Sequence, residues 1–216
     1  IPYEDKKALT LVEKVMGEYK WDTIIQIGDF MDFDCISTHN TTKLKTIEGK
    51  TVQADYDYAN KILDRWQRLA PKAQIVILEG NHEYRVPRYV DANPQMAGLM
   101  EVPKGLRLKE RRIKWVPYWS KGTLYNLGNA YFAHGQYTNE HHAKKMVSRF
   151  GVNIFYGHCV SDDTEILTKK GWRTREGVIA GKSEVLTLDP SDLRLKWNRV
   201  RKVTTYDSYK ELLHIT

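Results

Sequence analysis

The sequence predicts an α/β (α+β) sandwich, with helices packed on sheets, followed by a smaller all-β segment. Three observations predict this fold. Helix-periodic stretches alternate with short apolar runs through the first 158 residues. Polar motifs follow directly after those apolar runs, which is where open α/β sheets place their ligands. After residue 158 the segments become short, β-rich and separated by turn residues.

Apolar residues recur at helical spacing in three stretches of the first part, which predicts helices over 5–19, 56–69 and 141–150. Short apolar runs predict buried strands over 23–27, 74–78 and 152–156. Gly128-Asn129 predicts a hairpin turn within 125–133. The charged stretch 84–114 is interrupted by prolines, so only helical pieces are expected there.

The second part begins at Cys159. Strands are expected over 164–168, 172–174, 184–188, 195–202 and 212–216, with turns at Lys170-Gly171 and Ala180-Gly181. This change of pattern predicts a domain boundary between residues 158 and 159, giving domains of 1–158 and 159–216.

Composition narrows the class of protein. With 41% hydrophobic residues and six Trp, the 216-residue chain can bury a core. It holds no apolar run near the ~20 residues that span a bilayer, so no membrane partner is expected. Its two cysteines lie far apart, as is usual in a reducing compartment, so we expect a cytoplasmic protein. The net charge is +7. The basic residues are densest in one stretch, the basic cluster, defined as Lys104, Arg107, Lys109, Arg111, Arg112 and Lys114.

Four loops carry metal-binding chemistry, each after a predicted strand. They contain Asp29 and Asp32 in Gly-Asp-Phe-Met-Asp, Asn81 and His82 in Gly-Asn-His-Glu, His134 in Ala-His-Gly, and His158 in Gly-His. Carboxylate, amide and imidazole groups together suit divalent cations such as Mn²⁺, Zn²⁺ or Fe. Two metals activate water and neutralise charge on a phosphoryl group. The four loops therefore predict hydrolysis of a phosphoester.

Taken in order, these motifs resemble those of calcineurin-like metallophosphoesterases, over residues 1–158. The resemblance implies two divalent metal ions in the complete enzyme, with Asp29 bridging them and Asn81, His134 and His158 completing one. It implies that His82 stabilises the transition state or protonates the leaving oxygen. Asp32 would orient neighbouring residues without binding metal.

Two elements of the family pattern are missing. The resemblance places an Asp-x-His element directly before Ile1, and a final His two residues after His158, where the chain continues with Cys159 and Val160. Both would serve the second metal. The chain as given is therefore expected to assemble about one metal site and to show little or no turnover.

The segment that starts at Cys159 (Cys-Val-Ser-Asp-Asp-Thr-Glu-Ile-Leu-Thr) resembles the first conserved block of inteins, the Hint fold. The resemblance covers 159–216 and implies that the Cys159 thiol attacks the carbonyl of His158, the scissile bond of protein splicing. The rest of the intein and of the host would be missing partners. We expect the host sequence after the insert to begin Thr-His or Ser-His, which would restore the metal motif.

Two other interpretations remain open. A non-catalytic nucleic-acid-binding module could use the basic cluster around Arg111. A phosphoesterase could also carry an ordinary carboxyl-terminal β domain that does not splice. The phosphoester substrate stays open at this level, and a nuclease acting on nucleic acid would fit the basic bias.

Overall fold

The computed structural model describes residues 2–40, 42, 44–118, 124–137, 142–157, 166–173, 177–188 and 194–201. The chain forms two compact units. The first comprises Ile1–Gln136 and Val152–His158, and the second comprises Tyr137–Gly151 and Cys159–Thr216. The unit limit between His158 and Cys159 coincides with the predicted domain boundary, but 137–151 belongs by its contacts to the second unit. The division into 1–158 and 159–216 stays a prediction.

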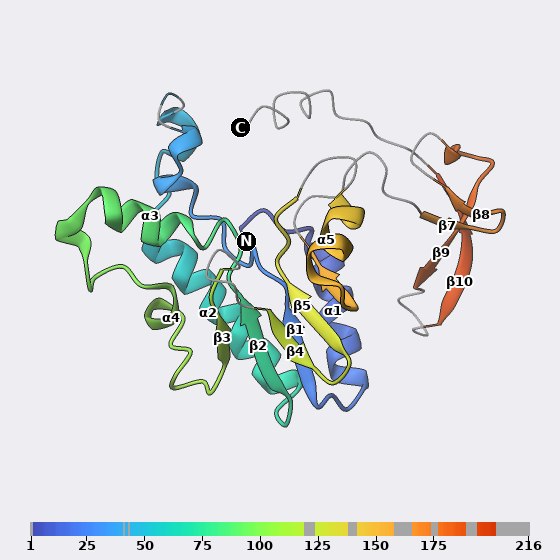
Figure 1. The fold of residues 1–216 in the computed structure, drawn as a ribbon, viewed down its shortest axis with the longest axis horizontal. Helices are drawn as coiled ribbons and strands as arrows, with labels where there is room; N and C mark the ends of the chain where they lie inside the picture. Colours follow the sequence, from blue (N-terminus) through green and yellow to red (C-terminus); the bar gives the residue numbers. More distant parts are fainter. Residues whose placement is uncertain are drawn as a thin grey trace. The chain divides into compact units, whose positions relative to one another are not determined.

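The first unit contains two three-stranded sheets. Strands β1 (Thr23–Gln26), β2 (Gln74–Leu78) and β3 (Lys114–Val116) form a parallel sheet in that order (Figure 1). In the other sheet β4 (Tyr125–Leu127) pairs antiparallel with β5 (Ala130–Ala133), which pairs parallel with β6 (Ile154–Tyr156). The predicted strands and the hairpin are confirmed, and so is the mixed α/β class.

Strand β2 shows how the sandwich is layered, because its successive side chains point to opposite faces. Ile75 and Ile77 join the main core, which includes the buried face of α2. Val76 and Leu78 pack on the other face, where Phe132 of β5 contacts their cluster. Helices thus cover one face of the parallel sheet and the second sheet covers the other.

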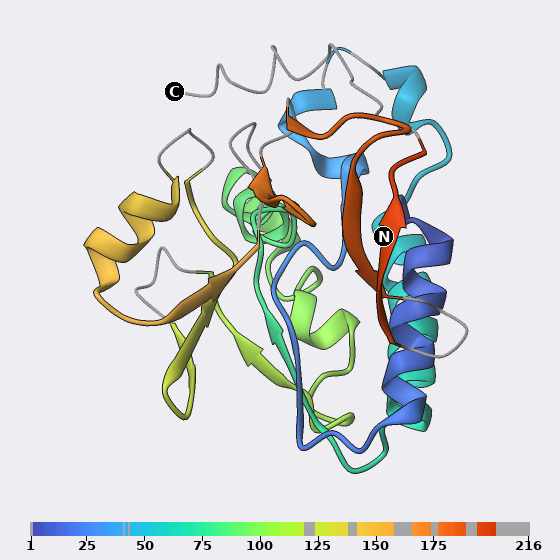
Figure 2. The same ribbon diagram turned by 90° about the vertical axis from the view of Figure 1, so that its right-hand side faces the viewer.

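Helices α1 (Lys6–Glu18) and α2 (Val52–Leu69) run side by side (Figure 2). Asp5 caps α1 by accepting hydrogen bonds from the backbone of Lys7 and Ala8. Helix α2 begins four residues before the predicted start because Thr51 accepts a hydrogen bond from the Ala54 N–H at 3.1 Å.

The remaining elements of the first unit are short. Two lie in the charged stretch, α3 (Arg85–Ala92) and α4 (Val102–Gly105), separated by the 3₁₀ turn η4 (Pro94–Met96). Three more 3₁₀ turns follow β1: η1 (Asp34–Ile36), η2 (Thr38–Asn40) and η3 (Leu44–Ile47). These pieces confirm the broken helical character expected for 84–114.

The second unit contains α5 (His142–Phe150) and an antiparallel sheet in the order β10-β9-β7-β8. The strands are β7 (Ile166–Thr168), β8 (Gly171–Arg173), β9 (Glu184–Leu188) and β10 (Leu195–Arg199). Four predicted strands are confirmed, and the one expected over 212–216 lies outside the described residues. The Hint fold itself stays a prediction. Within the described ranges, no helix is both long and apolar enough to cross a membrane.

Candidate metal centre

The loop after β1 has a backbone that few residues could adopt. Gly28 has φ +95° and Asp29 has φ +54°, so two consecutive residues lie in the left-handed region. A Cβ on Gly28 would lie 2.2 Å from His134 Nδ1. The side chain of Gln26 supports the turn, since it accepts from the Gly28 N–H and donates to the Gly28 carbonyl. Glycine is therefore required at position 28 for conformation and for space.

The loop after β2 presses against the Asp29 loop. A Cβ on Gly80 would lie 2.3 Å from both the backbone nitrogen and Oδ1 of Asp29. The His82 N–H donates to Asp29 Oδ1 at 3.0 Å. Because β1 and β2 are parallel neighbours, their carboxyl ends meet at one edge of the sheet. The predicted Asp29 and Asn81 loops are thus in direct contact.

Glu83 joins these two loops through its carboxylate, a role that the sequence analysis did not assign. The fully buried side chain accepts the Met31 N–H at Oε1 (2.7 Å), and the N–H groups of Asp29 (3.0 Å) and Gly80 (2.8 Å) at Oε2. Burial raises the pKa of Glu83, and the backbone N–H donors oppose that shift. Its place in the Gly-Asn-His-Glu motif was the signal that could have indicated it.

His134 follows β5 and reaches both loops. Its Nδ1 lies 2.9 Å from the carbonyl of Ile27, which can only accept, so Nδ1 carries the proton. Its Nε2 lies 2.9 Å from Asn81 Oδ1 and 3.3 Å from Asp29 Oδ2. In the neutral ring, Nε2 thus directs a lone pair towards two oxygen atoms. A second proton or a cation is needed to make this arrangement favourable.

The pKa values of Asp29 and His134 are shifted accordingly, so that both side chains favour their charged forms. Burial would raise the pKa of Asp29, but the hydrogen bond from His134 and the charges of His134 and His82 lower it to about 2. Burial works to lower the pKa of His134, and the neighbouring Asp29 carboxylate outweighs it, so that pKa is raised. The site favours positive charge between these two side chains.

The donor set fits a divalent metal. A carboxylate oxygen of Asp29 and the amide oxygen of Asn81 both lie within 3.3 Å of the imidazole nitrogen His134 Nε2. No group of three or more His, Cys, Asp and Glu side chains is arranged to hold a metal ion in the part of the chain that the structure describes. The set found here includes an amide, and the expected fourth ligand, His158, lies outside the described residues, as does Cys159. The preceding Gly157 donates its N–H to the His134 carbonyl at 3.0 Å, which brings the fourth motif's start beside the third.

His82 lies beside the candidate metal ligands, but its Nδ1 faces Asp32. Its Nδ1 is 2.6 Å from Asp32 Oδ1, and 31% of its side chain is exposed. Asp32 also accepts hydrogen bonds from Arg85 Nη1, at its backbone carbonyl (2.6 Å) and at Oδ1 (3.2 Å). Arg85 was not singled out in the sequence, because an arginine in a charged stretch carries no motif. The structure brings together His82 and Asp32, a contact that the sequence analysis did not name.

Two tyrosines line the same edge of the sheet. Tyr84 and Tyr118 stack with ring centroids 5.1 Å apart, and the Tyr118 ring lies 6.3 Å from that of His134. The Tyr118 N–H donates to Glu79 Oε2 at 2.7 Å, which holds the chain after β3 against the end of β2. The loops that carry Asp29, Asn81 and His134 therefore have an aromatic neighbour.

The calcineurin-like phosphoesterase family model matches residues 3–200. The chain belongs to this family. Membership implies a metal-dependent phosphoesterase, a hydrolase, and members generally bind two divalent metals. The match continues past Cys159 without a break at the predicted boundary. No curated protein and no solved structure matches the chain.

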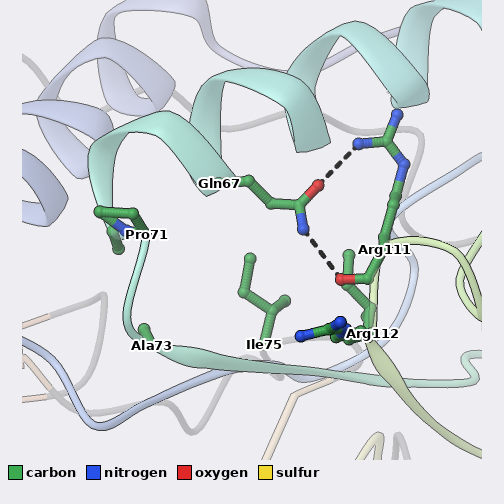
Figure 3. A pocket seen from close by; sticks show the side chains of 8 residues that line it. Gln67, Pro71, Ala73, Ile75, Arg111 and Arg112 are labelled. Atoms are coloured by element: carbon green, nitrogen blue, oxygen red, sulfur yellow. Dashed lines mark hydrogen bonds between the residues drawn. The ribbon is translucent and has the colours of Figure 1, made fainter.

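Within the basic cluster, the Arg111 side chain is mostly buried and contributes little positive charge to the surface. The guanidinium lies 2.7 Å from Asp64 Oδ1 and 2.8 Å from Gln67 Oε1, and it also donates to the Leu106 carbonyl. Only 11% of the Arg111 side chain is exposed. The adjoining pocket, lined by Gln67 and Arg111 among others (Figure 3), has a volume of about 40 Å³, room for water and not for a nucleotide. Arg111 is an internal structural residue.

Proposed function

We propose that residues 1–158 form the amino-terminal part of a dimetal phosphoesterase that becomes complete when an intein starting at Cys159 is spliced out. One observation carries the phosphoesterase half of the proposal: His134 Nε2 meets the oxygens of Asn81 and Asp29 at hydrogen-bonding distance. Family membership supports the same chemistry.

In this proposal Asp29, Asn81, His134 and His158 would hold one divalent cation, either Mn²⁺, Zn²⁺ or Fe, and Asp29 would also contribute to a second. The bound metals would supply an activated water and neutralise charge on the phosphoryl oxygens. His82 faces the phosphoester and, when both of its ring nitrogens carry a proton, gives the Nε2 proton to the leaving oxygen. Asp32 holds the Nδ1 side of that ring, so that Nε2 is directed outwards. The proposed substrate is a phosphoester, with nucleic acid as one member of that class.

Metal binding by the chain itself is the first test. Calorimetric titration with Mn²⁺ should give about one equivalent bound. Asp29→Asn and His134→Ala should each weaken binding by at least about tenfold to a hundredfold, the range that follows even from removing residues around metal ligands. Asp22→Asn, on an exposed residue before β1, is the matched control and should bind like the wild type. Equal affinity in all four proteins would refute the proposed site.

Turnover is tested on the spliced, complete protein. His82→Asn should lower kcat for an alkyl phosphoester by about 10²–10⁴-fold, the usual contribution of a positioned proton donor. Its Mn²⁺ affinity should stay close to that of the wild type, because the side-chain contact of His82 within the described part of the chain is with Asp32. An unchanged kcat would remove His82 from the reaction.

The splicing half of the proposal rests on the intein-like segment and on the position of the junction. The Cys159 sulfur would bond to the carbonyl carbon of His158 while the peptide C–N bond breaks and the freed amine takes the thiol proton. Two observations support the location: the limit between the compact units falls at this peptide bond, and Gly-His here ends a metal motif. The missing carboxyl-terminal intein and host segments are the required partners.

Cys159→Ala in the full-length gene tests splicing. The precursor should accumulate and the joined product should disappear on immunoblots, and dithiothreitol should no longer release a fragment that ends at His158. Cys35→Ala is the matched control, since it removes the other cysteine and should splice normally. Joined product from the Cys159 variant would favour an ordinary carboxyl-terminal β domain.

A further inference from the structure

We propose that Arg85 is a positioning residue that fixes the Asp32 carboxylate and, through it, the ring of His82. This inference rests on the role proposed for His82. The contact that suggests it is a shared oxygen: Asp32 Oδ1 lies 2.6 Å from His82 Nδ1 and 3.2 Å from Arg85 Nη1.

Arg85 is placed for this role by the fold. It is the first residue of α3, and its N–H donates to the carbonyl of His82 at 3.1 Å, so the helix start and the His82 loop form one turn. The side chain then crosses to the Asp29 loop, where it bonds the Asp32 carbonyl at 2.6 Å. It thereby connects the two loops at Asp32, in addition to the contacts that Glu83 makes.

The network is largely shielded from water. Side-chain exposure is 16% for Arg85 and 13% for Asp32. Arg85 Nη1 also lies 3.5 Å from Asp34 Oδ1, and Asp34 is held in turn by Tyr3 and Lys50. A shielded carboxylate with two fixed donors has one orientation available. Without Arg85, Asp32 would lose its guanidinium contact and keep the His82 ring and its interaction with Asp34, so its orientation would be less constrained.

Neutral histidine carries its proton on one nitrogen or the other, and a hydrogen bond on one side decides which. In the arrangement found here, His82 Nδ1 donates to Asp32, and Nε2 is left as the free position. We infer that Arg85 maintains this tautomer by holding the acceptor in place.

Nitrogen-15 NMR of the histidine side chains tests the inference at pH about 8.5, where ordinary histidines are neutral. In the wild type the two His82 nitrogens should have widely separated shifts, with the protonated signal at Nδ1. In Arg85→Gln the two shifts should converge, as both tautomers become populated. Asp32→Asn should also disturb the shifts, and His82→Asn assigns the signals.

Two further variants distinguish the effect of a positive charge on α3 from the effect of its position at residue 85. The three side-chain contacts of Arg85 with Asp32 and Asp34 all come from Nη1, so a single ammonium could replace them, and Arg85→Lys should keep the wild-type shifts. Arg88→Gln removes the same charge from an exposed site of α3 and should have no effect. Wild-type shifts in Arg85→Gln, or an equal disturbance by Arg88→Gln, would overturn the proposal.

A measurement on the wild type protects the test if Arg85→Gln fails to fold. A guanidinium held at Asp32 should rotate slowly and show separate Nη1 and Nη2 signals, whereas exposed Arg88 should show averaged ones. Averaged signals for Arg85 would also overturn the proposal. None of these readouts needs phosphoesterase turnover, so failure of the proposed activity would be seen separately, in the Mn²⁺ and kcat experiments.

Discussion

At the scale of single residues, Glu83 is the side chain on which the metal loops depend most. Its two oxygens accept three backbone N–H groups in a site without solvent. Glu83→Gln keeps the volume but turns one oxygen into an N–H₂ donor that faces another donor. At least one buried N–H then loses its partner, which should lower the free energy of unfolding by about 1–3 kcal/mol.

Urea unfolding followed by circular dichroism measures this loss. Glu110→Gln, on an exposed residue outside the loops, should cost close to nothing and serves as the control. If both variants lost the same free energy, the three N–H contacts of Glu83 would not be what stabilises the loops.

Asp34 supplies a prediction on pH. Burial opposes the shift, but the hydrogen bonds from Tyr3 and Lys50 lower the pKa of Asp34 below its ordinary value. A carboxylate with a lowered pKa stabilises the fold above the unfolded pKa of about 3.9, and that contribution is lost as pH falls further. The difference in unfolding free energy between wild type and Asp34→Asn should therefore shrink from pH 6 to about pH 3. A difference that stays constant with pH would contradict this assignment.

The sequence predicted Asp29, Asn81 and His134 because each follows a glycine or small residue at a strand end. It did not predict Glu83 or Arg85. In sequence, Glu83 is one more acid beside a candidate ligand, and only its burial identifies it as an acceptor of backbone N–H groups. Arg111 shows the converse, because it belongs to a run of basic residues and yet its side chain is only 11% exposed and pairs with Asp64.

At the scale of elements, the turns after β1 and β2 determine whether the site forms. Gly28→Ala would face both a left-handed backbone and a contact of 2.2 Å with His134 Nδ1. Gly49→Ala is a matched control, because Gly49 has φ +75° and nothing within 4 Å of the added Cβ. We expect Gly49→Ala to cost about 1–2 kcal/mol and to keep Mn²⁺ affinity. Gly28→Ala should cost more and abolish detectable Mn²⁺ binding in calorimetry.

Equal Mn²⁺ affinity in the two glycine variants would show that the close approach to His134 does not matter. The comparison is informative because both variants carry the backbone penalty and only one displaces a proposed ligand.

Element limits were harder to predict than element types. The apolar face of α2 indicated a helix from residue 56, since the first turn contributes mostly polar residues. The Thr51 cap, a contact between a hydroxyl and an N–H three residues on, sets the actual start. The strands and the hairpin could be predicted from local sequence. The order β4-β5-β6 and the parallel pairing of β5 with β6 could not, because they depend on contacts distant in sequence.

At the scale of the whole molecule, metal binding should raise thermal stability, because a ligand that binds only the folded state shifts the equilibrium towards it. At a free Mn²⁺ concentration of 100 times Kd the gain is about 2.7 kcal/mol, or roughly 5–10 °C in Tm for a unit of this size. Differential scanning calorimetry with and without EDTA measures it.

Asp29→Asn should lose the metal-dependent rise in Tm, and Asp22→Asn should keep it. A rise of the same size in Asp29→Asn would show that Mn²⁺ stabilises the protein from some other site.

The contacts that build the metal centre also determine when it can form during folding. The Glu83–Asp29 bond joins residues 54 apart, Asn81–His134 spans 53, and His134–Ile27 spans 107. Contacts of such long range are costly to close early and form late in folding. A growing chain on the ribosome lacks the imidazole donor of the candidate site until His134 has emerged. If the proposed site is correct, a cation would bind only after the long-range contacts have closed, and it would not act as a template for the first folding steps.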